Sequence, residues 1–310
     1  MDKTVKYYMA PLESVTTWIY RQAHAKIYGR LDKYFIPFLE PHEKRDFKTR
    51  ELQEILPEHN EGIYVVPQIL TNKADGFIRL GKALKDYGYQ EINLNLGCPS
   101  KTVVTKGKGS GFLAFPEELD CFLDNIFEAL GSELKLSVKT RIGKEKPEEF
   151  PRLLEIFNRY PLEELIIHPR VQTDGYKNYP RMEMYDLAAK ESKNPVCYNG
   201  DLFNQEKLEK FQKERPDTDC LMIGRGFLMN PGLLHPETGR KEFWEFHDLV
   251  YHGYLERDLG GYRNVLFKMK ELWLYQVKLF PEVKGLDKKI KKLQTQQEYE
   301  QLMGKLQTVS

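Results

Sequence analysis

Polar and reactive side chains follow six short apolar runs of this 310-residue sequence. In chain order they are Gln68; Asn93, Asn95 and Cys98; Lys139 and Arg141; His168 and Arg170; Asn199, Gly200 and Asp201; and Gly224 and Arg225. Ammonium and guanidinium groups bind anions, a thiol donates or loses a proton, and an imidazole does either near neutral pH. Their recurrence after successive apolar runs predicts that they share one functional site.

The last two of these places predict a phosphate site. Gly200 and Gly224 let backbone N–H groups approach an anion closely, and Arg225 adds a fixed cation. A tight turn is the alternative role of each glycine. The agreement of both segments favours phosphate binding.

Cys98 lies between Gly97 and Pro99, in a sharp turn that projects its thiol. The glycines in residues 106–111 predict a mobile loop that closes over a ligand. The other cysteines, Cys121, Cys197 and Cys220, are expected to be small buried hydrophobic residues. No His, Cys or Asp group has zinc spacing, so we expect no metal.

Lys139 and His168 each keep more than one interpretation. Lys139 ends an apolar run, where its ammonium binds an anion, forms a Schiff base or simply joins a salt bridge. His168 either positions a ligand through hydrogen bonds or transfers protons. Both roles of the histidine place it at the active site.

The elements that carry these residues alternate along the chain. Strands are predicted at residues 5–10, 34–39, 63–70, 91–94, 134–139, 164–168, 195–198 and 220–223. Helical patterns between them cover residues 77–87, 117–130, 148–160 and 205–213. Eight strands with crossovers predict an α/β fold, a (β/α)8 TIM barrel with its site at the carboxyl ends of the strands. A doubly wound sheet is disfavoured because the first turn, MAPLES, contains no glycine.

The alternation stops after residue 232, where aromatic-rich helices are predicted at 243–254 and 264–280, before a polar Lys/Gln segment from 287. We therefore predict a barrel domain at residues 1–238 and a small helical domain at 239–310. Residues 262–310 carry ten Lys/Arg and five Asp/Glu, a balance of +5 within a total of +1. This asymmetry suggests a polyanionic partner, although a solvated helical tail also explains it.

The overall composition is that of a globular protein, with 41% hydrophobic and 30% charged residues. It excludes a disordered chain and a disulfide-stapled miniprotein. No run approaches the roughly 18 apolar residues of a membrane span, and the charged start is not a signal peptide. We expect a cytoplasmic protein.

Several motifs resemble those of the tRNA-dihydrouridine synthases, most closely the shorter bacterial C-type branch. NLGCPSKTVVTKGKGSG is similar to the family's cysteine signature, and MAPLESVT to its opening turn. VKTRIG, HPRVQTDGY, NPVCYNGD and MIGRGFLMNP resemble four further motifs in the family's order. The segment RNVLFKMKELWLYQ is similar to its helical RNA-binding domain.

This resemblance implies an FMN enzyme that reduces uridines in tRNA with NADPH as electron donor, Cys98 being the general acid. Ala10, Pro11 and Leu12 would cradle the isoalloxazine, Gln68 would bond its polar edge, Lys139 would lie near N1/O2 and His168 would contact the ring. The ribityl phosphate would be held by Asn199, Gly200, Asp201, Gly224 and Arg225. The substrate would contact Asn95, Arg141 and Arg170. We also expect a monomer.

The sequence departs from the family pattern at Leu12, Ser14, Pro169 and Asn178, where Met, Gly, Gly and Gly are common. These changes affect substrate positioning and leave the flavin contacts intact. Three alternatives remain at this point: a flavin-dependent reductase or dehydrogenase of a free pyrimidine-like molecule, a Schiff-base aldolase, and an RNA-binding protein with a vestigial flavin site. The sequence does not specify which uridine is reduced or whether NADPH is preferred to NADH.

Overall fold

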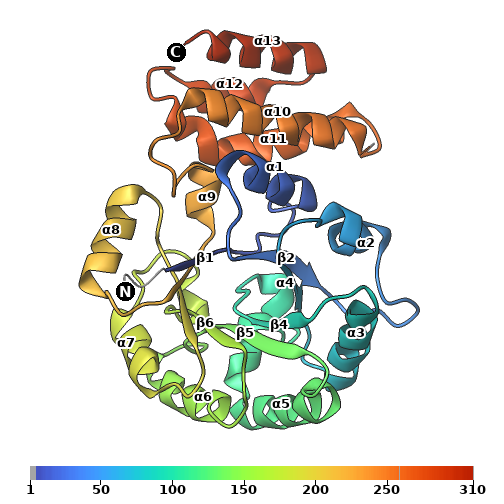
Figure 1. Ribbon diagram of the computed structural model, residues 1–310, viewed down its shortest axis with the longest axis vertical. Coiled ribbons are helices and arrows are strands. Elements are labelled where there is room, and N and C mark those ends of the chain that lie inside the picture. Colours follow the sequence, from blue (N-terminus) through green and yellow to red (C-terminus); the bar gives the residue numbers. More distant parts are fainter. Residues whose placement is uncertain (1–4, 258, 310) are drawn as a thin grey trace.

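Eight parallel strands close into a barrel, as predicted (Figure 1). The computed structural model describes residues 5–257 and 259–309. The strands are β1 (Lys6–Met9), β2 (Lys33–Leu39), β3 (Val65–Ile69), β4 (Glu91–Leu96), β5 (Lys135–Arg141), β6 (Glu164–His168), β7 (Val196–Asn199) and β8 (Cys220–Ile223). Each strand pairs with the next, and β8 pairs with β1, so every carboxyl end points to the same rim.

Helices lie between successive strands along the chain, most of them on the outside of the barrel. They are α1 (Trp18–Tyr28), α2 (Thr49–Ile55), α3 (Ala74–Asp86), α4 (Lys101–Val104), α5 (Pro116–Leu130), α6 (Phe150–Phe157), α7 (Met182–Glu191) and α8 (Gln205–Glu214). Helix α9 (Arg225–Met229) follows the last strand. The four predicted barrel helices correspond to α3, α5, α6 and α8, with ends displaced by a few residues. No helix within residues 5–257 and 259–309 has both the length and the apolar character that crossing a bilayer requires.

The interior of the barrel has a mainly apolar half, in which one buried carboxylate, that of Glu164, accepts from the Tyr8 hydroxyl, and a polar half. The apolar half is a buried cluster made of Tyr8, Ala10, Phe35, Val66, Ile166, Cys197, Cys220 and Met222. Strands β3, β4 and β5 instead bring buried polar side chains, namely Gln68, Glu91, Asn93, Asn95 and Ser137. Barrel interiors are usually filled by branched apolar residues, and this polar half is a departure from that rule. Each buried polar group in it needs a hydrogen-bond partner, because buried polar groups in proteins are almost always paired.

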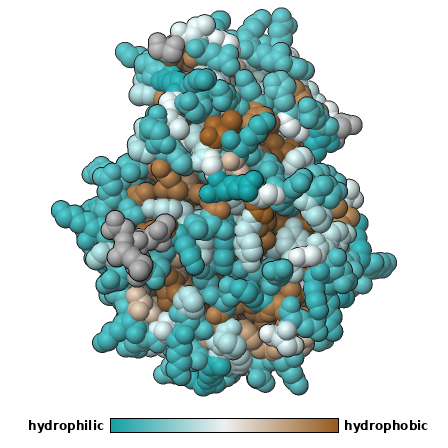
Figure 2. Space-filling model, in the orientation of Figure 1, coloured by the Kyte–Doolittle hydropathy of each residue, from teal (hydrophilic) through white to brown (hydrophobic). Residues whose placement is uncertain are grey.

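The C-terminal region is helical and packs above α1 and α9 (Figure 1). In the same orientation, Figure 2 shows the narrower upper part of the molecular surface. The C-terminal region contains α10 (Arg240–Glu256), α11 (Tyr262–Gln276), α12 (Leu286–Lys292) and α13 (Gln296–Gln307). Trp273 is fully buried at its centre, and its indole N–H donates to the hydroxyl of Tyr299 at 3.1 Å. The segment after residue 287 is therefore part of a packed core, because the apolar residues at helical spacing in α12 and α13 are buried.

The predicted helix 264–280 is wrong at its end. Helix α11 stops at Gln276, and a 3₁₀ turn covers Val277–Leu279. This turn brings Phe280 back against the rings of Trp244 and Trp273, at centroid distances of 5.6 Å each. Aromatic packing therefore favours a break in the helix that the apolar periodicity does not reveal.

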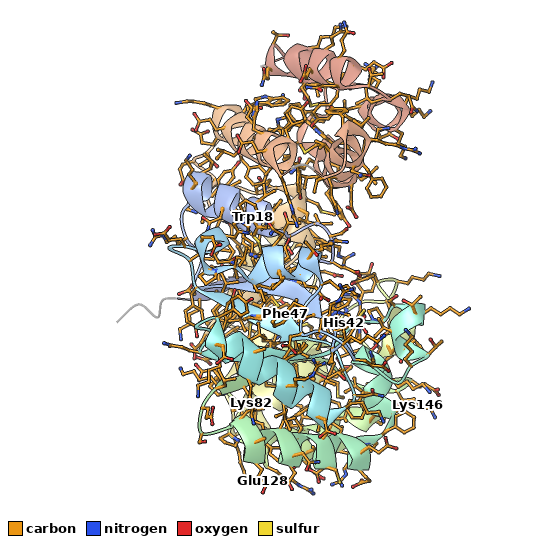
Figure 3. All side chains as sticks on the ribbon, turned by 90° about the vertical axis from the view of Figure 1, so that its right-hand side faces the viewer. Trp18, His42, Phe47, Lys82, Glu128 and Lys146 are labelled. Atoms are coloured by element: carbon orange, nitrogen blue, oxygen red, sulfur yellow. The ribbon has the colours of Figure 1, made fainter. Side chains whose placement is uncertain are left out.

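The first turn after β1 connects the barrel to the C-terminal helices. Ser14 has φ +66°, a left-handed conformation that favours glycine. Its hydroxyl donates to the Glu271 carboxylate at 3.1 Å, and its carbonyl accepts from Lys268 Nζ at 2.7 Å. Trp18 follows at the start of α1, below the C-terminal helices in Figure 3. The side chains of α11 thus hold a turn that the serine alone would strain.

One expectation about the cysteine region is corrected by the packing. Cys121, expected to be buried, lies exposed on α5. The glycines of residues 106–111 lie in a turn and a 3₁₀ helix (Gly109–Ala114), and closure of this segment over a ligand stays a prediction. A Cβ on Gly109, which has φ +56°, would lie 2.8 Å from the Cys98 carbonyl. Close backbone approach to Cys98 therefore explains this glycine.

Gly253 is expected to be essential for the packing of α10 on α1. An added Cβ there would lie 2.7 Å from Ile19 Cγ2, whereas a Cβ on Gly304 in α13 meets no atom within 4 Å. Gly253→Ala should lower the free energy of unfolding by about 1 kcal/mol, since overpacking exceeds the gain in helix propensity. Gly304→Ala, the matched control, should raise it by about 0.5–1 kcal/mol. Urea unfolding of both variants measures the difference, and equal shifts would contradict the packing argument.

Candidate active site

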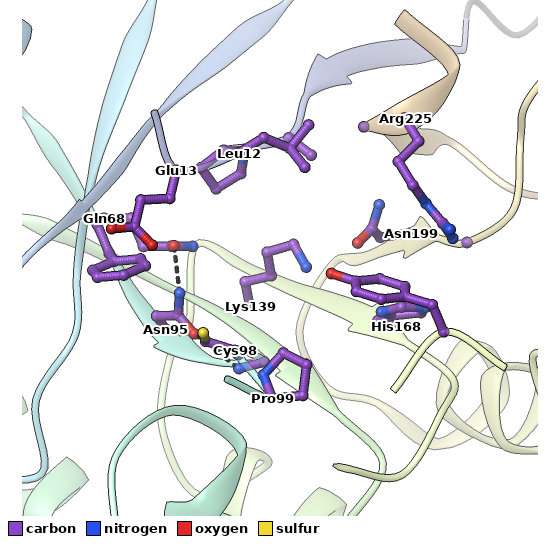
Figure 4. A pocket seen from close by; sticks show the side chains of 17 residues that line it. Leu12, Glu13, Gln68, Asn95, Cys98, Pro99, Lys139, His168, Asn199 and Arg225 are labelled. Carbon is purple, nitrogen blue, oxygen red and sulfur yellow. Dashed lines mark hydrogen bonds between the residues drawn. The ribbon is translucent and has the colours of Figure 1, made fainter. Parts of the chain in front are cut away.

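A cavity of about 210 Å³, open to solvent on one side, lies at the carboxyl ends of the strands. It brings together twelve of the residues that sequence analysis selected (Figure 4): Ala10, Pro11, Leu12, Gln68, Asn95, Cys98, Lys139, His168, Asn199, Gly200, Gly224 and Arg225. Asp201, Arg141 and Arg170 lie outside this lining.

Three lining residues were missed by sequence analysis, namely Glu13, Phe38 and Tyr176. Glu13 follows β1 and Phe38 lies near the end of β2, so the rule applied to the other six strands would have found both. Tyr176 reaches the cavity from the loop after β6, eight residues beyond the strand end. Nothing local in the sequence indicates that this loop folds back over the rim.

Cys98 is held at the rim by hydrogen bonds to its backbone. Its N–H donates to Asn95 Oδ1 at 2.9 Å, and its carbonyl accepts from the N–H and the hydroxyl of Ser110 at 3.1 and 2.8 Å. Burial raises the pKa of the Cys98 thiol, and the nearby Glu13 carboxylate raises it further. The thiol is therefore protonated at neutral pH and suited to donate a proton.

Lys139 carries an ammonium in the middle of the cavity wall (Figure 4). Burial lowers the pKa of Lys139 to about 8, and the neighbouring Arg141 guanidinium contributes to this shift. Among the described residues, no carboxylate is close enough to oppose the shift. The cavity therefore offers an incompletely compensated cation to a ligand.

His168 is a neutral imidazole whose tautomer is set by Arg170. Arg170 Nη1 donates to His168 Nε2 at 2.8 Å, and an arginine only donates, so the proton of the ring resides on Nδ1. Burial lowers the pKa of His168 well below its ordinary value, and the surrounding arginine and lysine charges add to this effect. The histidine is thus a fixed hydrogen-bonding group at neutral pH rather than a cation.

Asp201 pairs with two arginines beside the cavity. Its carboxylate accepts from both terminal nitrogens of Arg170 and from Arg225 Nη2 at 2.9 Å. The guanidinium of Arg225 also lies 4.5 Å from the ring centroid of Tyr176 and 4.7 Å from that of Phe203. Asp201 therefore orients Arg225, which lines the cavity, rather than lining it itself.

Arg141 joins two loops of the rim. Its three donor nitrogens bond the carbonyls of Gly97, Val171 and Gly175 at 2.8–3.0 Å. The loop before Cys98 is thus fixed to the loop that carries Tyr176. The substrate contacts predicted for Arg141 and Arg170 stay predictions, but both guanidinium groups already have structural partners.

The charges around the cavity favour an anionic ligand with polar edges. Lys139 and Arg225 supply cations, and Gln68, Asn95 and Asn199 supply amides. Within the described ranges, no three His, Cys, Asp or Glu side chains gather in a way that would hold a metal ion. The site therefore combines anion binding with a single proton-donating thiol.

Lys139 should give the ligand-free protein a distinct pH dependence. The pKa of Lys139 is about 8 in the folded protein, against the ordinary lysine value of 10.5. Between pH 8 and pH 10.5 the unfolded chain therefore binds more protons than the folded one, and the stability rises with pH. Lys139→Met should therefore be more stable at pH 7 by about 3 kcal/mol, an advantage that disappears by about pH 10.5. Chemical unfolding across this range tests it, with Lys135→Met, an exposed position on the same strand, as control. Parallel profiles for wild type and Lys139→Met would contradict the expectation.

The sequence was compared with those of known protein families and proteins. A model of the dihydrouridine synthase (Dus) family matches residues 8–308. The tRNA-dihydrouridine(16) synthase of Haemophilus ducreyi is 31% identical over 232 residues, which cover 71% of this chain and 67% of that protein. A probable tRNA-dihydrouridine synthase 2 of Bacillus subtilis is 27% identical and covers 79% of this chain and 75% of its own.

Solved structures share the fold at low sequence identity. A 2-naphthoyl-CoA reductase complex superposes with a TM-score of 0.57 at 12% identity, covering 79% of this chain and 51% of that one. A morphinone reductase in complex with tetrahydroNAD gives a TM-score of 0.51 at 11% identity, covering 74% and 85%. These likenesses concern the fold alone. Because the family model spans nearly the whole sequence, the chain belongs to the dihydrouridine synthase family.

Proposed function

We propose that this protein is an FMN-dependent tRNA-dihydrouridine synthase, which reduces the C5–C6 double bond of specific uridines in tRNA. The observation that carries the proposal is the protonated Cys98 thiol facing a cavity whose wall carries the Lys139 cation. When bound, reduced FMN supplies a hydride for C6 of the uracil. The Cys98 thiol then donates the proton that C5 takes up.

The residues of the cavity fit a flavin. The Lys139 ammonium lacks a carboxylate partner among the described residues, and the N1/O2 edge of a reduced isoalloxazine is a negative charge that suits it. Pro11 and Leu12 give an apolar wall, and the Gln68 amide keeps a donor hydrogen for the polar edge of the ring. His168, neutral and oriented by Arg170, completes the contacts.

The phosphate of FMN suits the loops after β7 and β8. Asn199, Gly200, Gly224 and Arg225 line this part of the cavity. We propose that Arg225 contacts the phosphate directly and that Asp201 acts by orienting Arg225. A guanidinium held by a carboxylate and two rings gives up little further freedom on binding.

The proton-donating role of Cys98 agrees with its surroundings. A cysteine nucleophile needs a lowered pKa, whereas burial and Glu13 raise the pKa of this thiol. Asn95 and Ser110 fix the backbone on both sides of it. The raised pKa of the Cys98 thiol therefore favours general acid catalysis over covalent catalysis.

We propose tRNA as the substrate because curated relatives are named tRNA-dihydrouridine synthases. A stacked base must be extruded to reach a cavity inside a barrel rim. The barrel domain at 1–238 would then hold FMN, and the helical domain at 239–310 would bind the RNA backbone; residues 1–4, 258 and 310 lie outside the described structure. NADPH as donor, a monomeric state and a cytoplasmic location complete the proposal.

Cys98→Ala should separate flavin chemistry from uridine reduction. We expect the variant to bind FMN and to accept electrons from NADPH as wild type does, while dihydrouridine formation on unmodified tRNA falls by about 10²-fold or more. Flavin absorbance and mass analysis of the digested tRNA measure the two steps. Cys121→Ala, at an exposed cysteine on α5, is the control.

Two outcomes would contradict this assignment. Uridine reduction by Cys98→Ala at the wild-type rate would refute the general acid role. Wild-type flavin that NADPH reduces and that a free pyrimidine reoxidises, with no response to tRNA, would favour a small-molecule reductase.

Exposed lysines of α12 should contribute to tRNA binding. Three of these exposed lysines are Lys288, Lys289 and Lys292. Changing all three to glutamate should weaken tRNA binding. It should also reduce the slope of log K against log salt concentration by roughly one for each phosphate that is no longer neutralised. Reversal of Lys82, Lys190 and Lys213, exposed on barrel helices, is the charge-matched control. Filter binding at several salt concentrations measures both, and identical slopes for the two triple variants would place the RNA contact elsewhere.

A further inference from the structure

A continuous hydrogen-bonded chain crosses the polar half of the barrel from its floor to Cys98. Lys33 Nζ lies 2.8 Å from Glu91 Oε2 at the floor, and Ser137 Oγ lies 3.0 Å from Glu91 Oε1. From Ser137 the chain continues through three amides to the rim: Asn93 Nδ2 to Ser137 Oγ at 2.9 Å, Gln68 Nε2 to Asn93 Oδ1 at 2.8 Å, and Asn95 Nδ2 to Gln68 Oε1 at 2.7 Å. Asn95 Oδ1 finally accepts the N–H groups of Gly97 and Cys98 at 3.0 and 2.9 Å.

The groups at the two ends of this hydrogen-bonded chain fix which atom donates and which accepts at every link. Backbone N–H groups at the rim only donate, so Asn95 must turn its oxygen to Cys98 and its NH₂ to Gln68. At the floor, Glu91 is paired with Lys33, and its carboxylate only accepts, so the Ser137 hydroxyl must donate to it. Within residues 5–257 and 259–309, the other acceptor near that hydroxyl is the Ile92 carbonyl at 3.5 Å, which imposes the same direction. Every amide between the ends therefore has a single orientation.

Only the upper members of the chain reach the cavity. Gln68 and Asn95 line it, whereas Asn93, Ser137 and Glu91 are at most 1% exposed below it. Glu91 precedes Asn95 by four residues on β4, roughly 13 Å at the rise of a strand. Mainly apolar side chains fill the opposite half of the same interior, so space-filling alone does not require the polar side chains of β3, β4 and β5.

We propose that Glu91 and Ser137 are remote positioning residues. Acting through Asn93, they determine which atoms Gln68 and Asn95 present to the cavity. Through Asn95 they also hold the turn that carries Cys98. The proposal rests on the proposed function in that Gln68 faces the flavin and Cys98 faces the uracil. The orientation gives Gln68 one remaining amide hydrogen, and Asn95 another, for these ligands. Because the Glu91 carboxylate holds one end of this series of hydrogen bonds, the amides of Asn93, Gln68 and Asn95 resist flipping. A flipped amide would place two donors, or two acceptors, against each other.

Ser137→Ala tests the chain at its middle. It removes the link between Asn93 and Glu91 and leaves the Lys33–Glu91 pair in place. The matched control is Cys220→Ala, which also deletes one buried atom inside the barrel but on the apolar half. Glu91→Gln keeps the volume of the side chain and supplies a second test, because the neutral amide both donates and accepts.

The first measurement needs neither flavin nor tRNA. In a Cys121→Ser background, iodoacetamide should alkylate Cys98 of the apo-protein about threefold faster or more in Ser137→Ala and in Glu91→Gln than in Cys220→Ala, because the Cys98 turn is less restrained. The second measurement is FMN binding to the apo-protein, followed by flavin fluorescence. We expect the affinity to fall roughly tenfold, the effect of one well-placed hydrogen bond, with a displaced visible absorption maximum.

The double variant distinguishes one connected chain from two independent defects. Glu91→Gln combined with Ser137→Ala should be no worse than the stronger single variant, since both interrupt the same path. Additive effects, or single variants that match Cys220→Ala in both measurements, would overturn the proposal. Wild-type protein that fails to bind FMN would instead count against the proposed function, while the alkylation rates would still test the chain.

Discussion

Closure of a parallel barrel is the constraint on which the rest of this structure depends. Since β8 pairs with β1 in the same direction as all other neighbours, eight strand ends meet at one rim. Residues as distant in sequence as Leu12, Cys98 and Arg225 therefore line one cavity. The same closure leaves no free sheet edge, so the rim loops are the part of the barrel that can vary without exposing unpaired strands.

Most charged groups at this rim have hydrogen-bond partners within the protein. Arg170 and Arg225 share the single carboxylate of Asp201, and Arg141 donates to backbone carbonyls. Lys139 has no such carboxylate among the described residues, and its lowered pKa expresses the resulting electrostatic penalty. A protein that retains this penalty is less stable without its ligand than it need be. The energy is recovered when an anionic group binds, which is how preorganised sites obtain affinity.

The sequence predicts the site best where chemistry follows a strand directly. Cys98, Lys139 and His168 were found because strand periodicity and the rim rule place them without any knowledge of the loops. Tyr176 was missed because its position depends on how the loop after β6 folds over Arg225. Arginine is similarly hard to place: Arg141 extends to carbonyls of residues 97, 171 and 175, and no local pattern encodes such a path. Loop conformation and long side chains thus limit sequence-based prediction more than strand order does.

Ser14 illustrates how a departure from a family pattern is accommodated. Its φ of +66° is the conformation in which glycine is favoured, which explains why glycine is common there in the family that the motifs resemble. Here the Ser14 hydroxyl donates to Glu271 of α11, and the backbone carbonyl, which a glycine would also carry, accepts from Lys268. The backbone strain of the serine is thus offset in part by a hydroxyl contact that glycine could not make. Leu12 and Glu13 of the same turn line the cavity, so the bonds of Ser14 link α11 to one part of the cavity wall.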